Sequence, residues 1–96
     1  MSSDENEVTA PRTLRILNNR GLHARASAKF VKCADAFDAR VSVTKDGQTV
    51  GGTSIMGLMM LGAARGSSVE LSAKGTDADA ALNALEALIN GRFGED

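Results

Sequence analysis

Hydrophobic and polar residues alternate along this chain with two different periods, and these periods predict its strands and helices. Alternation at every second residue predicts four short strands, at about residues 14–17, 40–44, 48–50 and 67–73. Apolar residues three and four positions apart predict a helix after the first, third and fourth strands. The predicted order of elements is therefore β-α-β-β-α-β-α.

Turn and capping residues mark the boundaries of these elements. Asp46 and Gly47 are typical of a tight hairpin turn, Ser54 is placed to cap a short helix, and Thr76 or Asp77 to cap the last one. The last helix has a single apolar stripe, formed by Ala78, Ala81, Leu82, Leu85, Leu88 and Ile89. This pattern favours an α+β fold, an open-faced two-layer sandwich in which three helices cover one face of a four-stranded antiparallel sheet.

Length and composition indicate one folded domain. The 96 residues suffice for one core, and the acidic, polar segment 1–10 is predicted to be a disordered tail before a domain over 11–96. There is no apolar run of membrane-spanning length and no apolar signal region at the N-terminus, so we expect a cytoplasmic protein without membrane insertion. Cys33 is the single cysteine, and we interpret it as a small core residue.

The only histidine, His23, lies where the first strand gives way to the first helix, in which Ala28, Val31 and Cys33 recur at helical spacing. The first N–H groups of a helix lack intrahelical partners and carry the positive end of the helix dipole, so this position favours an anionic group. A neutral imidazole has a free nitrogen lone pair and can act as a nucleophile toward phosphorus. Arg25 can offer a planar set of donors to phosphate oxygens.

Less specific interpretations of His23 and Arg25 stay open, because a single histidine is more often a hydrogen-bonded structural residue and a helix arginine is often merely solvated. The surrounding charge favours a functional site, since no acidic residue occurs from Val8 to Ala34. The basic residues of this stretch are Arg12, Arg15, Arg20, Arg25, Lys29 and Lys32. Such a patch attracts phosphate groups or an acidic protein surface. Nucleic acid is not favoured as a partner, because no aromatic residues are interleaved for stacking.

The short helix predicted after Ser54 is apolar on nearly every side. Leu58 and Leu61 are three residues apart and are expected to pack inward. The residues expected on an exposed face are Ile55, Met56 and Met59. An exposed patch that contains methionine suits adaptable partner binding, although inward packing of all these residues is an equally open alternative. A phosphate on the Ser54 hydroxyl would place negative charge beside this patch, at a helix end that stabilises it.

The two segments together resemble the two signatures of the HPr family, the histidine phosphocarriers of the bacterial phosphotransferase system, which include the nitrogen-branch carriers called NPr. The matching residues are GLHAR at 21–25 and SIMGLM at 54–59, followed by Leu61 and Gly62. Both signatures occur in the family's order and at its separation. The resemblance runs from about Thr13 to Phe93 and includes the order of strands and helices.

The resemblance implies that His23 accepts a phosphoryl group on Nδ1 from phosphorylated enzyme I, charged by phosphoenolpyruvate, and passes it to an EIIA-type protein. The chain would then be a covalent carrier and not an enzyme, without a cofactor or metal ion. The Arg25 side chain and the backbone of Ala24 and Arg25 would hold the phosphate, and Ser54 would be the target of an HPr kinase/phosphorylase. The implied docking residues are Arg20, Lys32, Ile55, Met56 and Met59. We expect a monomer, because one face must meet successive partners.

One residue departs from the family pattern, since Ala26 stands where the family usually has proline directly after the arginine. Proline suits the first turn of a helix because it presets φ, but alanine is the best helix former, so we expect the helix to persist with a slightly looser start. Together with the low aromatic content, this departure leaves both sugar uptake and the regulatory, nitrogen-related branch open, and we prefer the regulatory branch.

Two alternatives belong to other functional classes. The first is a regulatory binding module controlled by phosphorylation of Ser54, in which His23 transfers nothing; the presence of Arg25 beside the histidine argues against it. The second is a small nucleic-acid-binding or metal-binding domain. One histidine and one cysteine cannot form a closed metal site, and the acidic N-terminus disfavours nucleic acid.

Overall fold

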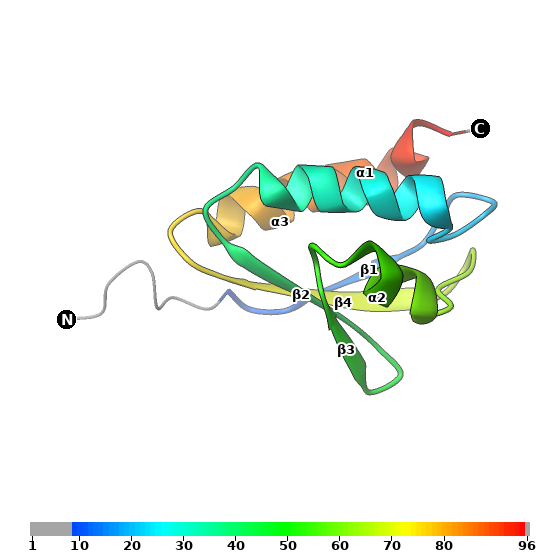
Figure 1. Ribbon diagram of the computed structural model, residues 1–96, viewed down its shortest axis with the longest axis horizontal. Coiled ribbons are helices and arrows are strands. Elements are labelled where there is room, and N and C mark those ends of the chain that lie inside the picture. Colours follow the sequence, from blue (N-terminus) through cyan, green and yellow to red (C-terminus); the bar gives the residue numbers. More distant parts are fainter. Residues whose placement is uncertain (1–8, 96) are drawn as a thin grey trace.

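The computed structural model describes residues 9–95 and contains the predicted elements in the predicted order (Figure 1). The strands are β1 (Arg12–Arg15), β2 (Arg40–Lys45), β3 (Gln48–Gly51) and β4 (Ser68–Lys74). The helices are α1 (Ala24–Asp35), α2 (Ile55–Met60) and α3 (Ala78–Asn90). A short 3-10 turn that the sequence analysis did not predict, η2 (Arg92–Gly94), follows α3.

The four strands form one antiparallel sheet in the order β1-β4-β2-β3. The central pair β2 and β4 is in a register that places Val43 opposite Leu71. The β2–β3 hairpin turns at Asp46 and Gly47, whose φ angles of 50° and 81° are those that a tight hairpin turn requires. The expected antiparallel sheet is therefore confirmed.

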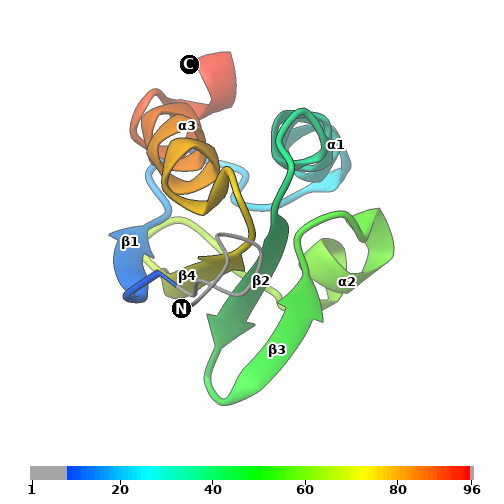
Figure 2. The same ribbon diagram turned by 90° about the vertical axis from the view of Figure 1, so that its left-hand side faces the viewer.

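The helices and the sheet form two layers around one core. Figure 2 shows α1 and α3 side by side above the sheet, with α2 below α1 at the β3 edge. Alternation along β4 buries Val69, Leu71 and Ala73 against the helices, while Glu70 between them is exposed and Ser72 half-buried. The largest fully buried apolar side chains are Phe30, Phe93, Ile16, Leu58, Leu71, Leu82, Leu85 and Ile89. The three-helix, open-faced sandwich predicted from the sequence is thus the observed fold.

The residues whose spacing predicted α1 are not the ones that form its buried face. Ala28 is exposed, whereas Ala26, Phe30 and Ala34 are buried, and Val31 and Cys33 pack against the core only at its margin. The spacing of Ala28, Val31 and Cys33 thus predicted the helix correctly, but the largest side chain on its buried face is that of Phe30.

Two chain boundaries also differ from expectation. Thr9 was assigned to the disordered tail, but its N–H donates to the Ala73 carbonyl at 2.9 Å, so this residue continues along β4. Residues 1–8 of the predicted tail lie outside the described residues. The first strand was expected at about residues 14–17, but β1 ends at Arg15. Ile16 lies beyond it, where its N–H donates to the Ser67 carbonyl and its carbonyl accepts from the N–H of Gly66. None of the helices described over residues 9–95 is long and apolar enough to cross a membrane.

Candidate functional site

Two loops from distant parts of the chain meet at the start of α1. The N–H of Leu22 donates to the Ala63 carbonyl at 2.9 Å, and Arg65 Nη1 donates to Asn19 Oδ1 at 2.6 Å. Gly21 makes this approach possible, because its φ is +63° and an added Cβ would lie 2.3 Å from the Ala63 oxygen. These contacts fix the loop before His23 against the loop that follows α2.

His23 is the N-cap residue of α1, as the sequence predicted. Its backbone is extended, its carbonyl accepts from the N–H of Ser27 at 2.8 Å, and its Nδ1 accepts from the N–H of Arg25 at 3.3 Å. Nδ1 therefore has its lone pair at the positive end of the helix dipole, close to N–H groups that have no intrahelical partner. The bond to Arg25 is long, so an atom that approaches Nδ1 can displace it at little cost.

The other ring nitrogen of His23 faces a carboxylate that the sequence analysis did not connect with it. Nε2 lies 2.7 Å from Glu95 Oε2, and both side chains are 15% exposed. Since the carboxylate is an acceptor, Nε2 is the donor of this bond. Both contacts of the ring thus assign the same tautomer, with the proton on Nε2 and the lone pair on Nδ1.

Asn18, which is completely buried, holds the carboxylate in place. Its Nδ2 donates to the Gly21 carbonyl at 2.8 Å and to Glu95 Oε1 at 3.1 Å. Both partners are acceptors, so the amide nitrogen and not the amide oxygen must face them. Asn18 therefore links the loop before His23 to the carboxylate opposite the ring.

The C-terminal turn brings Glu95 back over α1. Figure 1 shows this turn at the same end of the molecule as the start of α1. Phe93 is 1% exposed, and its carbonyl accepts from Lys29 Nζ at 2.6 Å. Arg92, Phe93 and Gly94 have φ angles of 58°, 56° and 72°. Left-handed backbone costs about 1–2 kcal/mol per non-glycine residue, so burial of the Phe93 ring and its hydrogen bond must offset this strain.

The environment of Glu95 shifts its titration. Partial burial raises the pKa of the Glu95 carboxyl, but hydrogen bonds from His23 and Asn18, together with the nearby positive charge of Lys29, outweigh this effect. The net pKa lies below the ordinary value, so Glu95 is a carboxylate at neutral pH.

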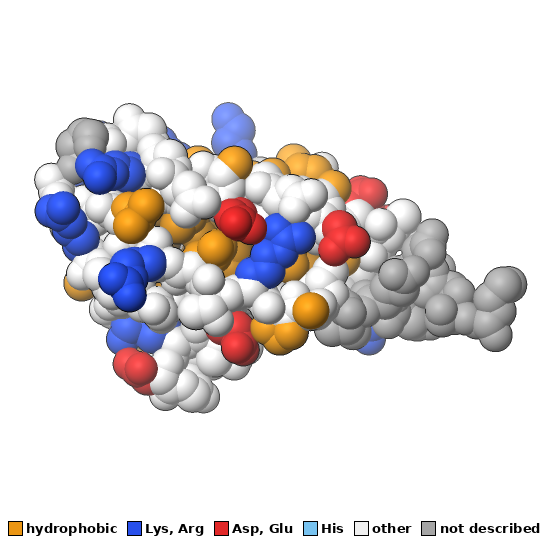
Figure 3. All heavy atoms as spheres, turned by 180° about the vertical axis from the view of Figure 1, so that it is seen from behind, with side chains coloured by type: hydrophobic (Ala, Val, Ile, Leu, Met, Phe, Trp, Pro, Cys, Tyr) orange, Lys and Arg blue, Asp and Glu red, His pale blue; other side chains and the backbone are white. Residues whose placement is uncertain are grey.

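The residues predicted to bind phosphate, and the basic residues near them, are exposed on the surface around His23. Ala24 and Arg25 are the first two residues of α1 and are exposed, and Arg20 and Lys32 are exposed as well. Figure 3 shows Lys and Arg side chains gathered at the end of the molecule that carries the loops before α1 and after α2. The site is therefore accessible, electropositive and open to a partner's surface.

The predicted division of α2 into a buried and an exposed face is confirmed. Leu58 and Leu61 are 0% and 6% exposed, and the exposed large apolar residues are Ile55, Met56, Met59 and Met60. Met60 was not among the predicted residues. Ser54 caps α2 by accepting from the N–H of Gly57 at 3.0 Å, and its side chain is exposed.

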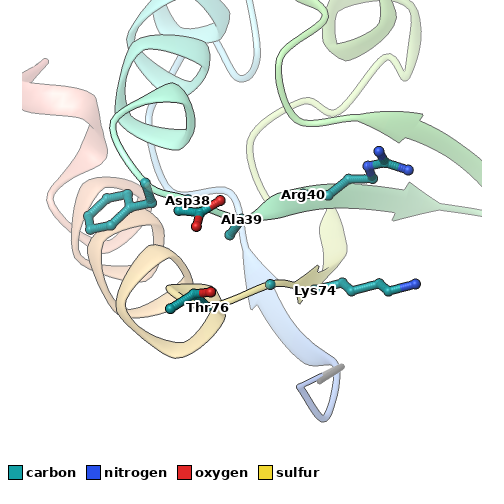
Figure 4. Close-up of a pocket in the computed structure, with 7 residues that line it drawn as sticks. Asp38, Ala39, Arg40, Lys74 and Thr76 are labelled. Carbon is teal, nitrogen blue, oxygen red and sulfur yellow. The ribbon is translucent and has the colours of Figure 1, made fainter. Parts of the chain in front are cut away.

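Other groups of interest lie elsewhere. Burial raises the pKa of the half-buried Cys33 thiol, which disfavours its reactive thiolate form. A hollow at the far end of α1 is lined by residues 37–40 and 74–76; Arg40 and Lys74 leave it in the same direction, away from Asp38 and Thr76 (Figure 4). Among residues 9–95 no three His, Cys, Asp or Glu side chains come together as a metal site.

Sequence reasoning missed the residues that surround the Nε2 side of the ring. Asn18, Phe93 and Glu95 contribute to this side, and Glu95 is 72 residues from His23 along the chain. One signal was available, because Phe93 is one of three aromatic residues and lies close to the C-terminus, where a buried ring implies that the chain end packs onto the core. No pattern in the sequence pointed to Asn18.

Fold and site define a class of small α+β sandwich proteins that present one histidine at a helix N-terminus, beside exposed basic and apolar surfaces. The chain belongs to the HPr family of the phosphotransferase system, because the family model described as "PTS HPr component phosphorylation site" matches residues 10–91. The protein is therefore a phosphocarrier of that system and not a catalytic enzyme.

Individual relatives agree with this assignment. The chain is 53% identical over 83 residues to phosphocarrier protein HPr of Neisseria meningitidis serogroup A, covering 86% of this chain and 93% of the relative. It is 40% identical over 84 residues to phosphocarrier protein NPr of Shewanella violacea, covering 88% and 92%. A crystal structure of HPr-C-His from Thermoanaerobacter tengcongensis has a TM-score of 0.88 at 44% identity, covering 92% and 99%. Identity is higher with HPr than with NPr, which does not support our preference for the nitrogen-related branch.

Proposed function

We propose that His23 accepts a phosphoryl group on Nδ1 from phosphorylated enzyme I and passes it to an EIIA-type protein. The observation that carries this proposal is the position of Nδ1, which lies at the N-terminus of α1 with only a 3.3 Å bond to the N–H of Arg25. When the Nδ1 lone pair forms a bond to phosphorus, the bond from phosphorus to the donor breaks and its electron pair stays on the donor. The reverse exchange loads the acceptor.

The surroundings of Nδ1 suit the phosphoryl oxygens. Once Nδ1 is bonded to phosphorus, the backbone N–H groups of Ala24 and Arg25 are free to donate to these oxygens, at the end of α1 where the dipole favours negative charge. The Arg25 guanidinium is exposed and can fold over the group as a charged donor.

The docking surface that we propose consists of Arg20, Lys32, Ile55, Met56 and Met59. These residues are all exposed, and helices α1 and α2, which carry four of them, contact each other. Methionine side chains adapt their shape to different surfaces, and basic residues accelerate the encounter with an acidic partner. One carrier face can thus meet enzyme I and an EIIA-type protein in turn.

Incubation with enzyme I, magnesium and phosphoenolpyruvate tests the transfer, with intact mass and acid lability as readouts. Because His23 is the only histidine, an acid-labile gain of one phosphate that is absent from His23→Ala locates the group. Arg25→Ala should slow loading about tenfold, the lower end of what a charged hydrogen bond contributes. Arg40→Ala is the matched control, because Arg40 is exposed at the other end of α1. No gain of phosphate with an active enzyme I would refute the proposal.

A regulatory role for Ser54 is part of the same proposal. Its exposed hydroxyl caps the helix that carries the apolar patch, so phosphorylation by an HPr kinase/phosphorylase would add charge at the edge of the docking surface. An acid-stable phosphate that appears with such a kinase and is lost in Ser54→Ala supports this role. If phosphate is added to Ser54 but partner transfer rates do not change, the hydroxyl is not a regulatory site. Gain of this acid-stable phosphate without any loading of His23 would favour the alternative binding module.

We further propose that the carrier acts as a monomer in the cytoplasm. A single exposed docking face is sufficient for successive transfers, and a second copy seated on it would block them. A related HPr has been crystallised as a dimer, so light scattering coupled to gel filtration is the direct test. A dimer at micromolar concentration would contradict the monomeric state.

A further inference from the structure

We propose that Arg40 and Lys74 form a binding site for the acidic N-terminal segment of the same chain, residues 1–8. The two residues, termed the basic pair, lie where β2 begins and β4 ends. Figure 1 shows these strand ends at the side of the molecule opposite the start of α1. The contact is independent of the phosphoryl transfer proposed for His23.

The basic pair places two positive charges side by side on the sheet. Arg40 and Lys74 are directly opposite each other in the β2–β4 register, and both side chains are exposed. Their neighbours Val41 and Ala73 are buried against the helices, so both cations lie on the face of the sheet that no helix covers. Figure 4 shows them leaving their strands in the same direction. Like charges in opposed positions repel each other, so this arrangement favours a bound anion.

No carboxylate within residues 9–95 forms an ion pair with either member of the basic pair. Asp38 lies two residues before Arg40, but the arginine side chain points away from it (Figure 4). Asp77 uses its Oδ2 to accept from the N–H of Asp38 at 2.9 Å. The ion pairs found over the described part of the chain involve other cations. The charge of the basic pair is therefore available to an acidic segment.

The turn before α3 holds the backbone of this site in place. The N–H of Asp77 donates to the Asp38 carbonyl at 2.9 Å. Gly75 has a φ angle of +133°, and an added Cβ would lie 2.9 Å from the same carbonyl oxygen. This close approach fixes the end of β4 against the start of β2, so the backbone of the site is in place before an anion binds.

The acidic segment enters the described structure beside the basic pair. The N–H of Thr9 donates to the Ala73 carbonyl at 2.9 Å, and the Thr9 hydroxyl accepts from the N–H of Ala73 at 3.3 Å. Ala73 directly precedes Lys74, so the N-terminal segment begins at the strand that carries this lysine. Segment 1–8 contains no lysine or arginine, and its acidic residues are Asp4, Glu5 and Glu7.

The length of chain before Thr9 matches the distance to the basic pair. An extended residue spans at most about 3.6 Å, so Glu7 lies within roughly 7 Å of Thr9. Neighbouring strands are about 4.8 Å apart, which places the two cations one and two strand spacings away. The basic surface around His23 is too distant for Glu7, because the 12-residue helix α1 alone is about 18 Å long. Neutralisation of the basic pair leaves the surface around His23 to attract acidic partners.

Zero-length cross-linking of the full chain with a carbodiimide tests this contact directly. The reagent joins a carboxylate to a lysine amine as an amide, and mass spectrometry of tryptic peptides should find peptide 1–12 linked to Lys74. The Lys45–Asp46 ion pair, at 2.9 Å, is the internal positive control. A mixture of ¹⁵N-labelled and unlabelled protein distinguishes links within one copy from links between copies. Links only to Lys32, links only between copies, or none at Lys74 beside a positive control would overturn the proposal.

Urea unfolding of charge variants tests the same contact without a reagent. Neutralisation of the segment, by Asp4→Asn with Glu5→Gln and Glu7→Gln, should lower the urea midpoint by roughly 0.2–0.5 M at low ionic strength. The decrease should be absent when Arg40→Gln and Lys74→Gln are already present. It should persist when the matched control substitutions Arg20→Gln and Lys32→Gln are present.

Screening provides the last check, because the Debye length is about 3 Å in 1 M salt and the decrease should disappear there. No decrease at low ionic strength, or an equal decrease with and without the basic pair, would overturn the proposal. A decrease that persists in 1 M salt would do so as well. Neither experiment uses enzyme I, so these outcomes are separate from those that test the transfer at His23.

Discussion

Replacement of Gly21 by alanine should destabilise the protein more than any substitution that affects only backbone conformation. The φ angle of +63° costs an alanine about 1–2 kcal/mol. In addition, the new Cβ would lie 2.3 Å from the Ala63 oxygen and 2.8 Å from the Cα of Ala64, both of them backbone atoms that cannot rotate away. The backbone shifts that such overpacking forces typically cost a further ~1–3 kcal/mol, so the total loss of stability should be about 2–5 kcal/mol.

Gly62→Ala is the control for this substitution. The φ angle of Gly62 is +66°, nearly the same as that of Gly21, but an added Cβ would meet nothing within 4 Å. This variant should therefore lose only about 1–2 kcal/mol of stability. The difference between the two variants isolates the clash with the loop after α2. Urea unfolding followed by circular dichroism measures both, because the chain has no tryptophan or tyrosine for a fluorescence signal. Equal losses in the two variants would refute the argument that Gly21 is required for close approach.

Three further predictions concern other parts of the site. Ala26→Pro should change the free energy of unfolding in urea by less than about 1 kcal/mol, because the N–H of the third residue of α1 has no intrahelical acceptor. A much larger loss would show that the buried position of residue 26 cannot accommodate the proline ring. Ser54→Ala should cost about 1 kcal/mol by the same assay through loss of the cap on Gly57, and Ser54→Asp should recover most of it; equal losses in both would exclude capping as the cause. Wild type should have a larger free energy of unfolding than Glu95→Gln above the ordinary pKa of a glutamate. This difference should vanish as pH falls through the lowered pKa of Glu95. A difference that persists below both pKa values would contradict a contribution from the carboxylate.

The sequence predicted those parts of the site that are formed by local patterns. His23 and Ser54 both follow an extended segment and precede an apolar helix, so hydrogen bonding to the first N–H groups of that helix could be inferred from position alone. The exposed face of α2 followed from helical spacing, because Leu58 and Leu61 can turn inward only if Met56 turns outward. Each of these inferences depends on residues within one or two helical turns of one another.

The remaining parts depend on contacts between distant segments, which periodicity does not encode. Asn18 is fully buried, although a pattern of hydrophobic and polar residues places an asparagine on the surface. The turn at 92–94 has left-handed φ angles at Arg92 and Phe93, and propensity predicts no such conformation for these residues. Both features exist because the Phe93 ring packs into the core and Asn18 finds two acceptors there.

The two nitrogens of the His23 ring have different requirements, and the fold meets them with different kinds of structure. Nδ1 must be reachable by a partner, and it lies at the end of a helix whose N–H groups are available without any other element. Nε2 must keep its proton in a site open to water, which needs an acceptor with a fixed position. The acceptor is therefore supplied from the far end of the chain and anchored by a buried aromatic ring. From this we expect the tautomer of His23 to depend on packing at Phe93, so that Phe93→Ala should raise the Nδ1–H fraction by releasing Glu95 from its position.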